Sequence, residues 1–421
     1  HPATIRRQRQ MCIRDRLRKD TQKNVTLPTF KRRVFLKNLS VVGIGSTVFG
    51  QHKCTSITGL AKKAASDAIL DAGIDKGRIG ALYVGNFVSG PLSGQEVLGG
   101  ILTNALGLGA IPATKVEGAC ASGGIAFRHA CLSVAAGLTD YAIAIGVEKM
   151  THRNTNVVTE ALNSALDRDI DGEAGHTFPG LYGLAWRLHA KHYGTSRAQV
   201  SAVVRKNKRA GLKNPLAQMG KMLSEDDIIN SRVISDPLRL YDCCPVTDGA
   251  SAVIVTTAEN AKYSKTPISV LSTVQTSGNP HVPKSEGPMS FQATQVACNE
   301  AIQIAGITRQ DVSLIELHDC FSIAEIIDLE DLGFINQGHA ASWAEEGRTD
   351  INGDLPTNPS GGLISKGHPV GATGVGQIFE LCKQLRGTHP NQVRGAKIGL
   401  AHNLGGCGVT CSVSILANPN A

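Results

Sequence analysis

Hydrophobic and polar positions follow two rhythms from about residue 41 onward. Short apolar runs rich in β-branched residues predict strands at "SVVGIGSTVFG", "IGALYVGNFVSG" and "YAIAIGVEKM". Between them, "TGLAKKAASDAILDAG" has helical spacing and ends at Gly73, whereas "ASGGIAFRHACLSVAAG" predicts a helix built from small residues. This alternation predicts an α/β fold in which helices cover both faces of a sheet.

A second passage repeats the same order. Strands are predicted at "TPISVLSTVQTSG" and "DVSLIELHDCF", a helix at "FQATQVACNEAIQIAG", a Gly-rich turn into a helix at "GHPVGATGVGQIFELCKQLRG", and a strand hairpin at "AKIGLAHNLGGCGVTCSVSIL". The passages around Cys120 and His368 read as counterparts, which predicts two similar halves, residues 34–260 and 261–421. The polar stretch 151–240 is predicted to be a helical insertion, a loop domain within the first half.

Composition and charge narrow the class of protein. The chain of 421 residues is 42% hydrophobic and 19% charged, which is ordinary for a globular protein. No apolar run approaches the roughly 20 residues of a membrane helix, so we expect no membrane span. The net charge of +8 is concentrated in residues 1–33, which hold 11 Lys and Arg against two Asp. The remainder is nearly neutral, so no nucleic-acid-binding face is expected.

We exclude the basic N-terminal arm, residues 1–33, from the prediction of the fold. A mitochondrial transit peptide, a native tail and a non-native segment around "MCIRDR" all fit its composition. The end "ILANPNA" is not a peroxisomal address, so we expect a mitochondrial or cytoplasmic location. The 11 cysteines show no C-x-x-C pairs, which argues against a disulfide framework and against a zinc ribbon, and favours a reducing compartment.

Three short motifs carry candidate chemistry. Cys120 lies where a strand meets a helix, so the helix dipole favours its thiolate and free backbone N–H groups can receive an oxyanion; the alternative is a buried cysteine that packs like alanine. His368 sits on a rigid Gly-Pro turn, suited either to accept a proton from a thiol or merely to cap a helix. "HDCF" offers His318 as donor or base and Cys320 as acid or base, while Asp319 either orients one of them or faces solvent.

Taken together, these motifs resemble the thiolase superfamily, most closely the sterol carrier protein-type thiolases and bacterial and archaeal acetyl-CoA acetyltransferases. The stretches that carry the resemblance are "DPLRLYDCCPVTDGA", "HDCF", "NPSGGLISKGHPVGATG" and "HNLGG", and it covers about residues 40 to 418. It implies the duplicated five-layered αβαβα fold with an inserted loop domain, in a homodimer or homotetramer. It also implies CoA as co-substrate, with no permanently bound cofactor and no metal.

The resemblance also implies a mechanism. Cys120 would be the nucleophile that forms an acyl-enzyme, His368 its activating base, and Cys320 the group that moves the α-proton. His318 and His368 would polarise the thioester oxygen, and the backbone N–H groups of Cys120 and Gly405 would hold the oxyanion. The reaction implied is thiolysis of a 3-ketoacyl-CoA or the reverse Claisen condensation of acetyl-CoA, as in fatty acid β-oxidation and lipid metabolism.

Some residues depart from the family pattern or leave alternatives open. Many thiolases carry a reactive cysteine where this chain has Asn403, so Cys320 is expected to replace it and Cys407 ranks below. Glu117 would raise the pKa of Cys120 unless it points away. Cys243 and Cys244 are expected to pack against a turn.

A thiolase-fold acyl-CoA binder or scaffold with little turnover is the alternative function. Basic residues of the insertion suit either CoA contacts or a solvated face: Arg205, Lys206, Lys208, Arg209 and Lys213.

Overall fold

The computed structural model describes residues 38–281 and 288–419, so the predicted basic arm, 1–33, lies outside the described residues. The first half contains strands β1 (Leu39–Ser46), β2 (Ile79–Gly85), β3 (Ala113–Val116), β4 (Tyr141–Glu148) and β7 (Gly249–Thr257). Its helices before the insertion are α2 (Ile57–Ala72), α3 (Ser89–Ser93), α4 (Leu98–Leu106) and α5 (Ser122–Ala135). Helix α2 ends as predicted, with Gly73 in the left-handed conformation at its C-cap.

The second half follows the short helix α10 (Ala258–Ala261). Its strands are β8 (Ile268–Ser277), β9 (Leu314–Glu316), β10 (Ile398–Gly405) and β11 (Thr410–Ala417). Its helices are α11 (Gln292–Ala305), α12 (Ser322–Asp331), α13 (Ala340–Glu345), α14 (Gly362–Lys366) and α15 (Thr373–Leu385). Strand β9 ends at Glu316, so the HDCF residues lie in the connection from β9 to α12 rather than in the strand itself.

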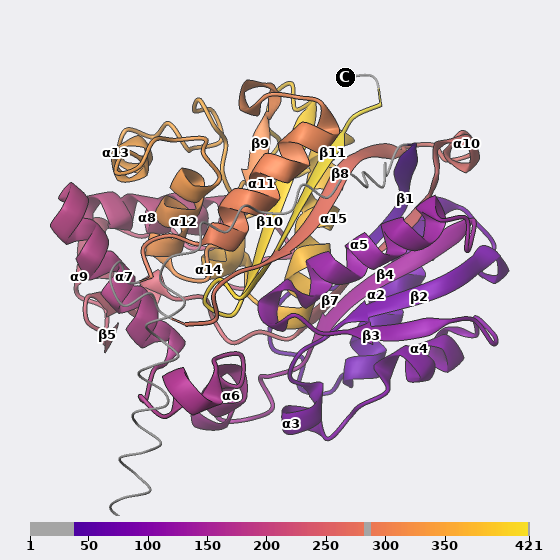
Figure 1. Ribbon diagram of the computed structural model, residues 1–421, viewed down its shortest axis with the longest axis horizontal. Coiled ribbons are helices and arrows are strands. Elements are labelled where there is room, and N and C mark those ends of the chain that lie inside the picture. Colours follow the sequence, from indigo (N-terminus) through magenta and orange to yellow (C-terminus); the bar gives the residue numbers. More distant parts are fainter. Residues whose placement is uncertain (1–37, 282–287, 420–421) are drawn as a thin grey trace, which may run out of the picture. The chain divides into compact units, whose positions relative to one another are not determined.

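The predicted duplication is visible in the sheet topology. Within the described residues, nine strands are ordered β3-β2-β4-β7-β1-β8-β11-β10-β9 (Figure 1). In the first set β2 and β4 are parallel and β7 is antiparallel to both of its neighbours; β9, β10 and β11 repeat this pattern in the second set. A parallel bridge from Ile315 to Thr357 takes the place of β3. The two sets join where Leu39 to Val41 of β1 pair with β8.

The helices form layers around these two sets of strands. Helix α2 contacts β1, β4 and β7 on one outer side, and α11 contacts β8 and β11 on the other. Helices α5 and α15 contact each other and strands of both sets, so they lie between them. This is the αβαβα arrangement that the family resemblance implies, and it brings the first residues of α5 and α15 close to each other.

The insertion between β4 and β7 packs on the second half. It contains α6 (Thr155–Asn163), α7 (Phe178–Tyr193), α8 (Arg197–Lys213), α9 (Glu225–Ile229), β5 (Val233–Ser235) and β6 (Leu238–Arg239). Helix α8 contacts α12, α13 and α14, and α7 contacts α12. One apolar cluster joins Tyr182 and Trp186 of α7 to Phe321 and Ile323 at the start of α12. The insertion therefore covers the HDCF segment with side chains from the first half.

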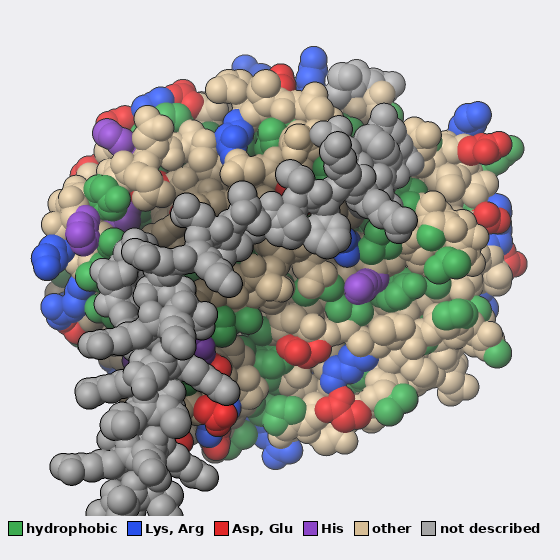
Figure 2. Space-filling view, viewed as in Figure 1, with side chains coloured by type: hydrophobic (Ala, Val, Ile, Leu, Met, Phe, Trp, Pro, Cys, Tyr) green, Lys and Arg blue, Asp and Glu red, His purple; other side chains and the backbone are tan. Residues whose placement is uncertain are grey.

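Charged side chains of both signs are scattered over the face shown in Figure 2, with uncharged surface between them. This agrees with the nearly balanced charge of residues 34–421. Among the described helices, none combines the length and the apolar character that crossing a membrane would require.

Candidate active site

Cys120 lies on a strained turn directly before α5. Ala119 adopts φ = 48°, a left-handed conformation that is unusual for a residue with a side chain. Ser122 closes the turn, because its hydroxyl accepts from the N–H of Gly118 at 3.0 Å and donates to the carbonyl of Ala119 at 2.6 Å. The turn thus presents Cys120 at the beginning of the helix, as the sequence predicts.

Glycines bring this turn against its counterpart, the turn that carries His368. A Cβ atom on Gly123 would lie 2.8 Å from the carbonyl oxygen of Gly371, and one on Gly374 would lie 2.2 Å from the backbone nitrogen of Gly124. Only glycine allows the backbones of α5 and α15 to approach so closely. The small residues after Cys120 and His368 therefore place the two turns next to each other.

Cys120, His318 and His368 converge. The Cys120 sulfur and one ring nitrogen from each histidine all lie within 4.8 Å of one another. The two imidazole rings meet edge to face, with their centroids 5.0 Å apart. Both histidines are buried, and Cys120 is partly exposed. Cys120 thus forms one cluster with two histidines that lie more than 190 positions after it in the sequence.

Hydrogen bonds to the Nδ1 atoms define which tautomer each histidine adopts. The Thr373 hydroxyl donates to the carbonyl of Pro369, so it accepts from Nδ1–H of His368 at 2.7 Å, which leaves Nε2 of His368 unprotonated. Nδ1 of His318 lies 3.2 Å from the Asn403 amide nitrogen, which can only donate, so the proton of His318 is on Nε2. His368 is therefore equipped as a proton acceptor and His318 as a hydrogen-bond donor.

Asn403 is a site residue whose role the sequence did not reveal. Its amide nitrogen donates to the carbonyl of Cys120 at 2.9 Å, and its oxygen accepts from the N–H of Gly124 at 3.2 Å. These two bonds fix the orientation of the amide, and with it the tautomer of His318. Asn403 thus positions both the turn that carries Cys120 and the ring of His318.

The three-residue cluster is close enough to raise the question of a metal site. A ligating histidine must offer a lone pair, but the Nε2 of His318 carries the proton. Cys120 would also have to bind as a thiolate. This donor set therefore fits proton transfer and hydrogen bonding better than metal coordination.

Burial keeps the cluster uncharged at rest. It raises the pKa of Cys120 to about 12, against the effect of the helix N-terminus expected from the sequence, and the carboxylates of Glu148 and Glu117 act in the same direction. Burial also lowers the pKa of His368 to about 3 and that of His318 well below its usual value. At neutral pH the pair is a thiol beside a neutral imidazole, so any reaction of Cys120 as a thiolate would require a base.

Cys320 lies beside this cluster. Burial raises the pKa of its thiol well above the usual value, and the thiols of Cys244 and Cys120 add to that effect. The backbone N–H of Cys244 donates to the carbonyl of Cys320 at 3.0 Å. Cys244, expected from the sequence only to pack against a turn, thus belongs to the wall of the site. Cys407 is partly buried on the turn between β10 and β11.

Asp319 points away from its two neighbours. Its carboxylate accepts from the backbone N–H of Leu363 at 2.7 Å and from the amide of Asn207 at 2.9 Å. It is fully buried, so it neither orients His318 or Cys320 nor faces solvent. Instead it holds the segment that leads to His368 against helix α8.

Gly405 of β10 packs against the turn that carries Cys120. A Cβ atom there would lie 2.3 Å from the carbonyl oxygen of Gly118 and 3.2 Å from the side chain of Ala121. The backbone N–H of the next residue, Gly406, acts on the Cys120 sulfur and lowers the pKa of its thiol. The end of β10 therefore brings a backbone donor to the sulfur of Cys120, while the role of Gly405 in holding an oxyanion stays a prediction.

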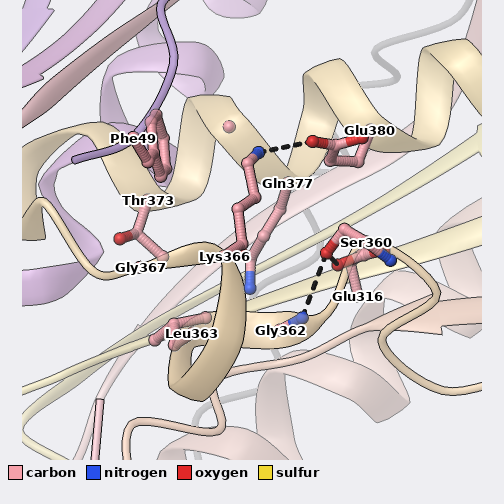
Figure 3. Close-up of a pocket in the computed structure, with 11 residues that line it drawn as sticks. Phe49, Glu316, Ser360, Gly362, Leu363, Lys366, Gly367, Thr373, Gln377 and Glu380 are labelled. Carbon is pink, nitrogen blue, oxygen red and sulfur yellow. Dashed lines mark hydrogen bonds and ion pairs between the residues drawn. The ribbon is translucent and has the colours of Figure 1, made fainter. Parts of the chain in front are cut away.

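A buried polar cluster braces the segment before His368 (Figure 3). Glu316, at the end of β9, accepts from the N–H and hydroxyl of Ser360 at 3.0 and 2.6 Å. Lys366 forms an ion pair with Glu380 of α15 at 2.6 Å, beside the ring of Phe49. These contacts surround a small cavity and link the segments that carry His318 and His368.

Glu316 should make stability depend on pH. Burial, followed by the charge of Glu380, raises its pKa from 4.5 to about 7. The folded state therefore binds a proton on Glu316 more tightly than the unfolded state does. The resulting contribution to the free energy of unfolding is fully present below pH 4.5 and is lost as the pH rises through 7. We expect Glu316→Gln to gain stability relative to wild type between pH 5 and 8, by on the order of 3 kcal/mol. Urea unfolding across this range measures the difference.

The exposed Glu160→Gln serves as the control for this experiment. A difference between Glu316→Gln and wild type that does not change from pH 5 to pH 8 would contradict an elevated pKa at Glu316.

The basic residues of the insertion divide into two groups. Lys206 is buried against Glu325 at 2.9 Å, and Lys208 is buried with its amine donating to the carbonyl of Ile364. Both are therefore structural. Arg205 pairs with Glu225, and Arg209 pairs with the half-buried Asp350. Lys213 is exposed and is the residue of this set best placed to meet an anion from solution.

Comparison with known proteins places the chain in a family. The model "Thiolase, N-terminal domain" matches residues 39–259, and "Thiolase C-terminal domain-like" matches residues 275–418. Acetyl-CoA acetyltransferase from Methanothermobacter thermautotrophicus is 41% identical over 386 residues, covering 91% of this chain and all of that protein. Sterol carrier protein 2 from Gallus gallus is 33% identical, over 93% of this chain and 73% of that protein.

Solved structures agree with this fold. The chain of the Ltp2-ChsH2(DUF35) aldolase superposes with a TM-score of 0.79 at 22% identity, covering 92% of this chain and all of that one. At this identity the likeness concerns the fold alone. The two family models together span nearly all of the described residues. The chain therefore belongs to the thiolase family.

Proposed function

We propose that the protein is a CoA-dependent acyltransferase that cleaves a 3-ketoacyl-CoA by thiolysis or runs the reverse Claisen condensation of acetyl-CoA. The observation that carries the proposal is the convergence of Cys120, His318 and His368 within 4.8 Å, with the unprotonated Nε2 of His368 available to a thiol. A scaffold would not require these tautomers, and the four side chains of the proposed mechanism are all present in this chain.

In the first half-reaction, His368 takes the proton of Cys120 as its sulfur attacks the 3-keto carbon. The backbone N–H groups of Cys120 and Gly405 stabilise the resulting oxyanion. The Cα–Cβ bond then breaks, and its electron pair forms the enolate of acetyl-CoA, whose thioester oxygen is held by Nε2–H of His318. Cys320 protonates the enolate carbon and becomes a thiolate.

In the second half-reaction, the Cys320 thiolate takes the proton of the incoming CoA thiol, and the CoA sulfur attacks the acyl group on Cys120. Cys120 leaves and recovers its proton from His368, so all protons balance. Condensation is the same sequence in reverse. Coenzyme A is a co-substrate here and no permanent cofactor is required.

The proposal also covers the metabolic role, the oligomeric state and the location of the enzyme. We place it in lipid metabolism, with fatty acid β-oxidation as the setting for cleavage, in a homodimer or homotetramer, and in mitochondria or cytoplasm. Residues 34–260 and 261–421 would be its two halves, with 151–240 as the loop domain. Burial of the HDCF segment by the insertion supports the last assignment.

The test is a thiolysis assay with acetoacetyl-CoA and with a longer 3-ketoacyl-CoA, together with condensation of acetyl-CoA. We expect turnover of at least one ketoacyl-CoA, and the preferred chain length then identifies the substrate class. A protein that binds CoA but turns over none of these substrates would be the scaffold instead.

A further inference from the structure

Tyr182 belongs to α7 of the insertion, yet it shares an apolar cluster with Cys320 of the other half of the chain and interacts with its thiol. Its ring stacks on Phe321 at a centroid distance of 4.7 Å and an angle of 28°, and it also contacts Phe291 at 6.2 Å. The side chain is 2% exposed. These aromatic contacts hold the ring, so its hydroxyl has one position available to it.

The Tyr182 hydroxyl is buried and makes no hydrogen bond of ordinary geometry with the described residues. It nevertheless lies close enough to the Cys320 thiol to interact with it. Burying an unpaired hydroxyl is unfavourable, since it loses its hydrogen bonds with water. The titratable groups that act on it are Cys320, Cys407 and Asp328, and Cys320 has the largest effect. A hydroxyl held next to a thiol gains a strong acceptor only when that thiol ionises.

We propose that Tyr182 is a positioning residue for Cys320: its hydroxyl donates a hydrogen bond to the Cys320 sulfur whenever that sulfur is a thiolate. This inference rests on the proposed function, in which Cys320 becomes a thiolate after it protonates the enolate. The same thiolate removes the α-proton of acetyl-CoA in condensation, and the sulfur–hydrogen bond that forms is balanced by the carbanion left on the substrate.

Among the groups that act on Cys320, Tyr182 is the one that can stabilise its thiolate. The groups that act on Cys320 are the thiols of Cys244 and Cys120, the carboxyl group of Asp328 and the Tyr182 hydroxyl. The two thiols and Asp328 disfavour the thiolate, as burial does, and Tyr182 alone of the four favours it. The insertion would thus supply the donor that makes a buried thiol usable as a base.

The experiment compares wild type with Tyr182→Phe, which removes the hydroxyl and keeps the stacked ring. Exchange of the acetyl-CoA methyl protons in D₂O reports on Cys320, and rapid-quench acetylation reports on Cys120. We expect exchange to slow roughly 10-fold at neutral pH, because a hydrogen bond to an ionised group is lost. Acetylation should slow much less, because there Cys320 only protonates the departing CoA thiolate, which is a good leaving group. The rise of the exchange rate with pH should also move to higher pH in the variant.

Tyr141→Phe, at another buried tyrosine on β4, is the matched control and should alter neither rate. Equal losses of exchange and acetylation, an unmoved pH profile, or an effect confined to KM would overturn the assignment. If wild type itself forms no acetyl-enzyme, the proposed function fails and the assignment falls with it. A loss of exchange in Tyr182→Phe that far exceeds the loss of acetylation supports both.

Discussion

Cys120→Ser should abolish thiolysis and condensation, lowering kcat by roughly 10⁴-fold or more, as is common when a covalent nucleophile is removed. Serine keeps the size and the turn, but its hydroxyl is far less acidic than a thiol already raised to a pKa of about 12. The neutral His368 beside it cannot generate an alkoxide at a useful rate. Steady-state assays in both directions measure the loss, and CoA binding should persist.

Mass spectrometry gives an independent reading of this prediction. Wild type incubated with acetyl-CoA should gain the mass of one acetyl group on the peptide that contains Cys120, and Cys120→Ser should gain none. Cys407→Ser is the control, since this thiol lies on a neighbouring turn outside the cluster. Turnover by Cys120→Ser within 10-fold of wild type, or acetylation of another cysteine, would refute the assignment.

Cys320→Ala should separate the two halves of the reaction. Making and breaking the carbon–carbon bond should slow by roughly 10²- to 10⁴-fold, the usual contribution of a positioned acid or base. Acetylation of Cys120 by acetyl-CoA should slow much less, because His368 activates Cys120 in that step and Cys320 only protonates the departing CoA thiolate, which is a good leaving group. Single-turnover assays of acetylation beside steady-state thiolysis measure the difference.

Cys244→Ala is the matched control for this second variant. Cys244 lies next to Cys320 and has a similarly elevated thiol pKa, but no step of the proposed mechanism uses it. If Cys244→Ala loses the carbon–carbon step and Cys320→Ala retains it, the acid/base is Cys244. If both variants retain it, the proton is moved by another group.

Local features of the site followed from the sequence. The position of Cys120 at a helix start, the glycines behind it and the turn around His368 each depend on a few neighbouring residues, and the structure places them as predicted. The duplication could also be predicted from the sequence, because the same order of predicted strands and helices occurs twice along the chain. Residues that act across the fold, by contrast, left no local signal.

Asn403 illustrates such a residue, since it contacts the Cys120 carbonyl from 283 positions away. The charge state of Cys120 could not be predicted either, because helix position favours a thiolate whereas burial, a tertiary property, disfavours it more strongly. The adjacent residues of the HDCF motif suggested one active-site cluster, but the backbone directs the Asp319 side chain away from the site. The packing of the insertion, which brings Tyr182 to Phe321, depends on contacts between distant segments.

The repeated topology has a consequence for how such a site arises. The turns before α5 and α15 are equivalent places in the two halves, yet one carries a thiol and the other its base. A pair of identical ancestral halves would have brought two copies of the same residue face to face. Reactivity therefore required the copies to diverge while their backbones stayed alike. The present chain keeps a symmetric scaffold around an asymmetric chemical centre, and neither half alone holds a complete set of reacting groups.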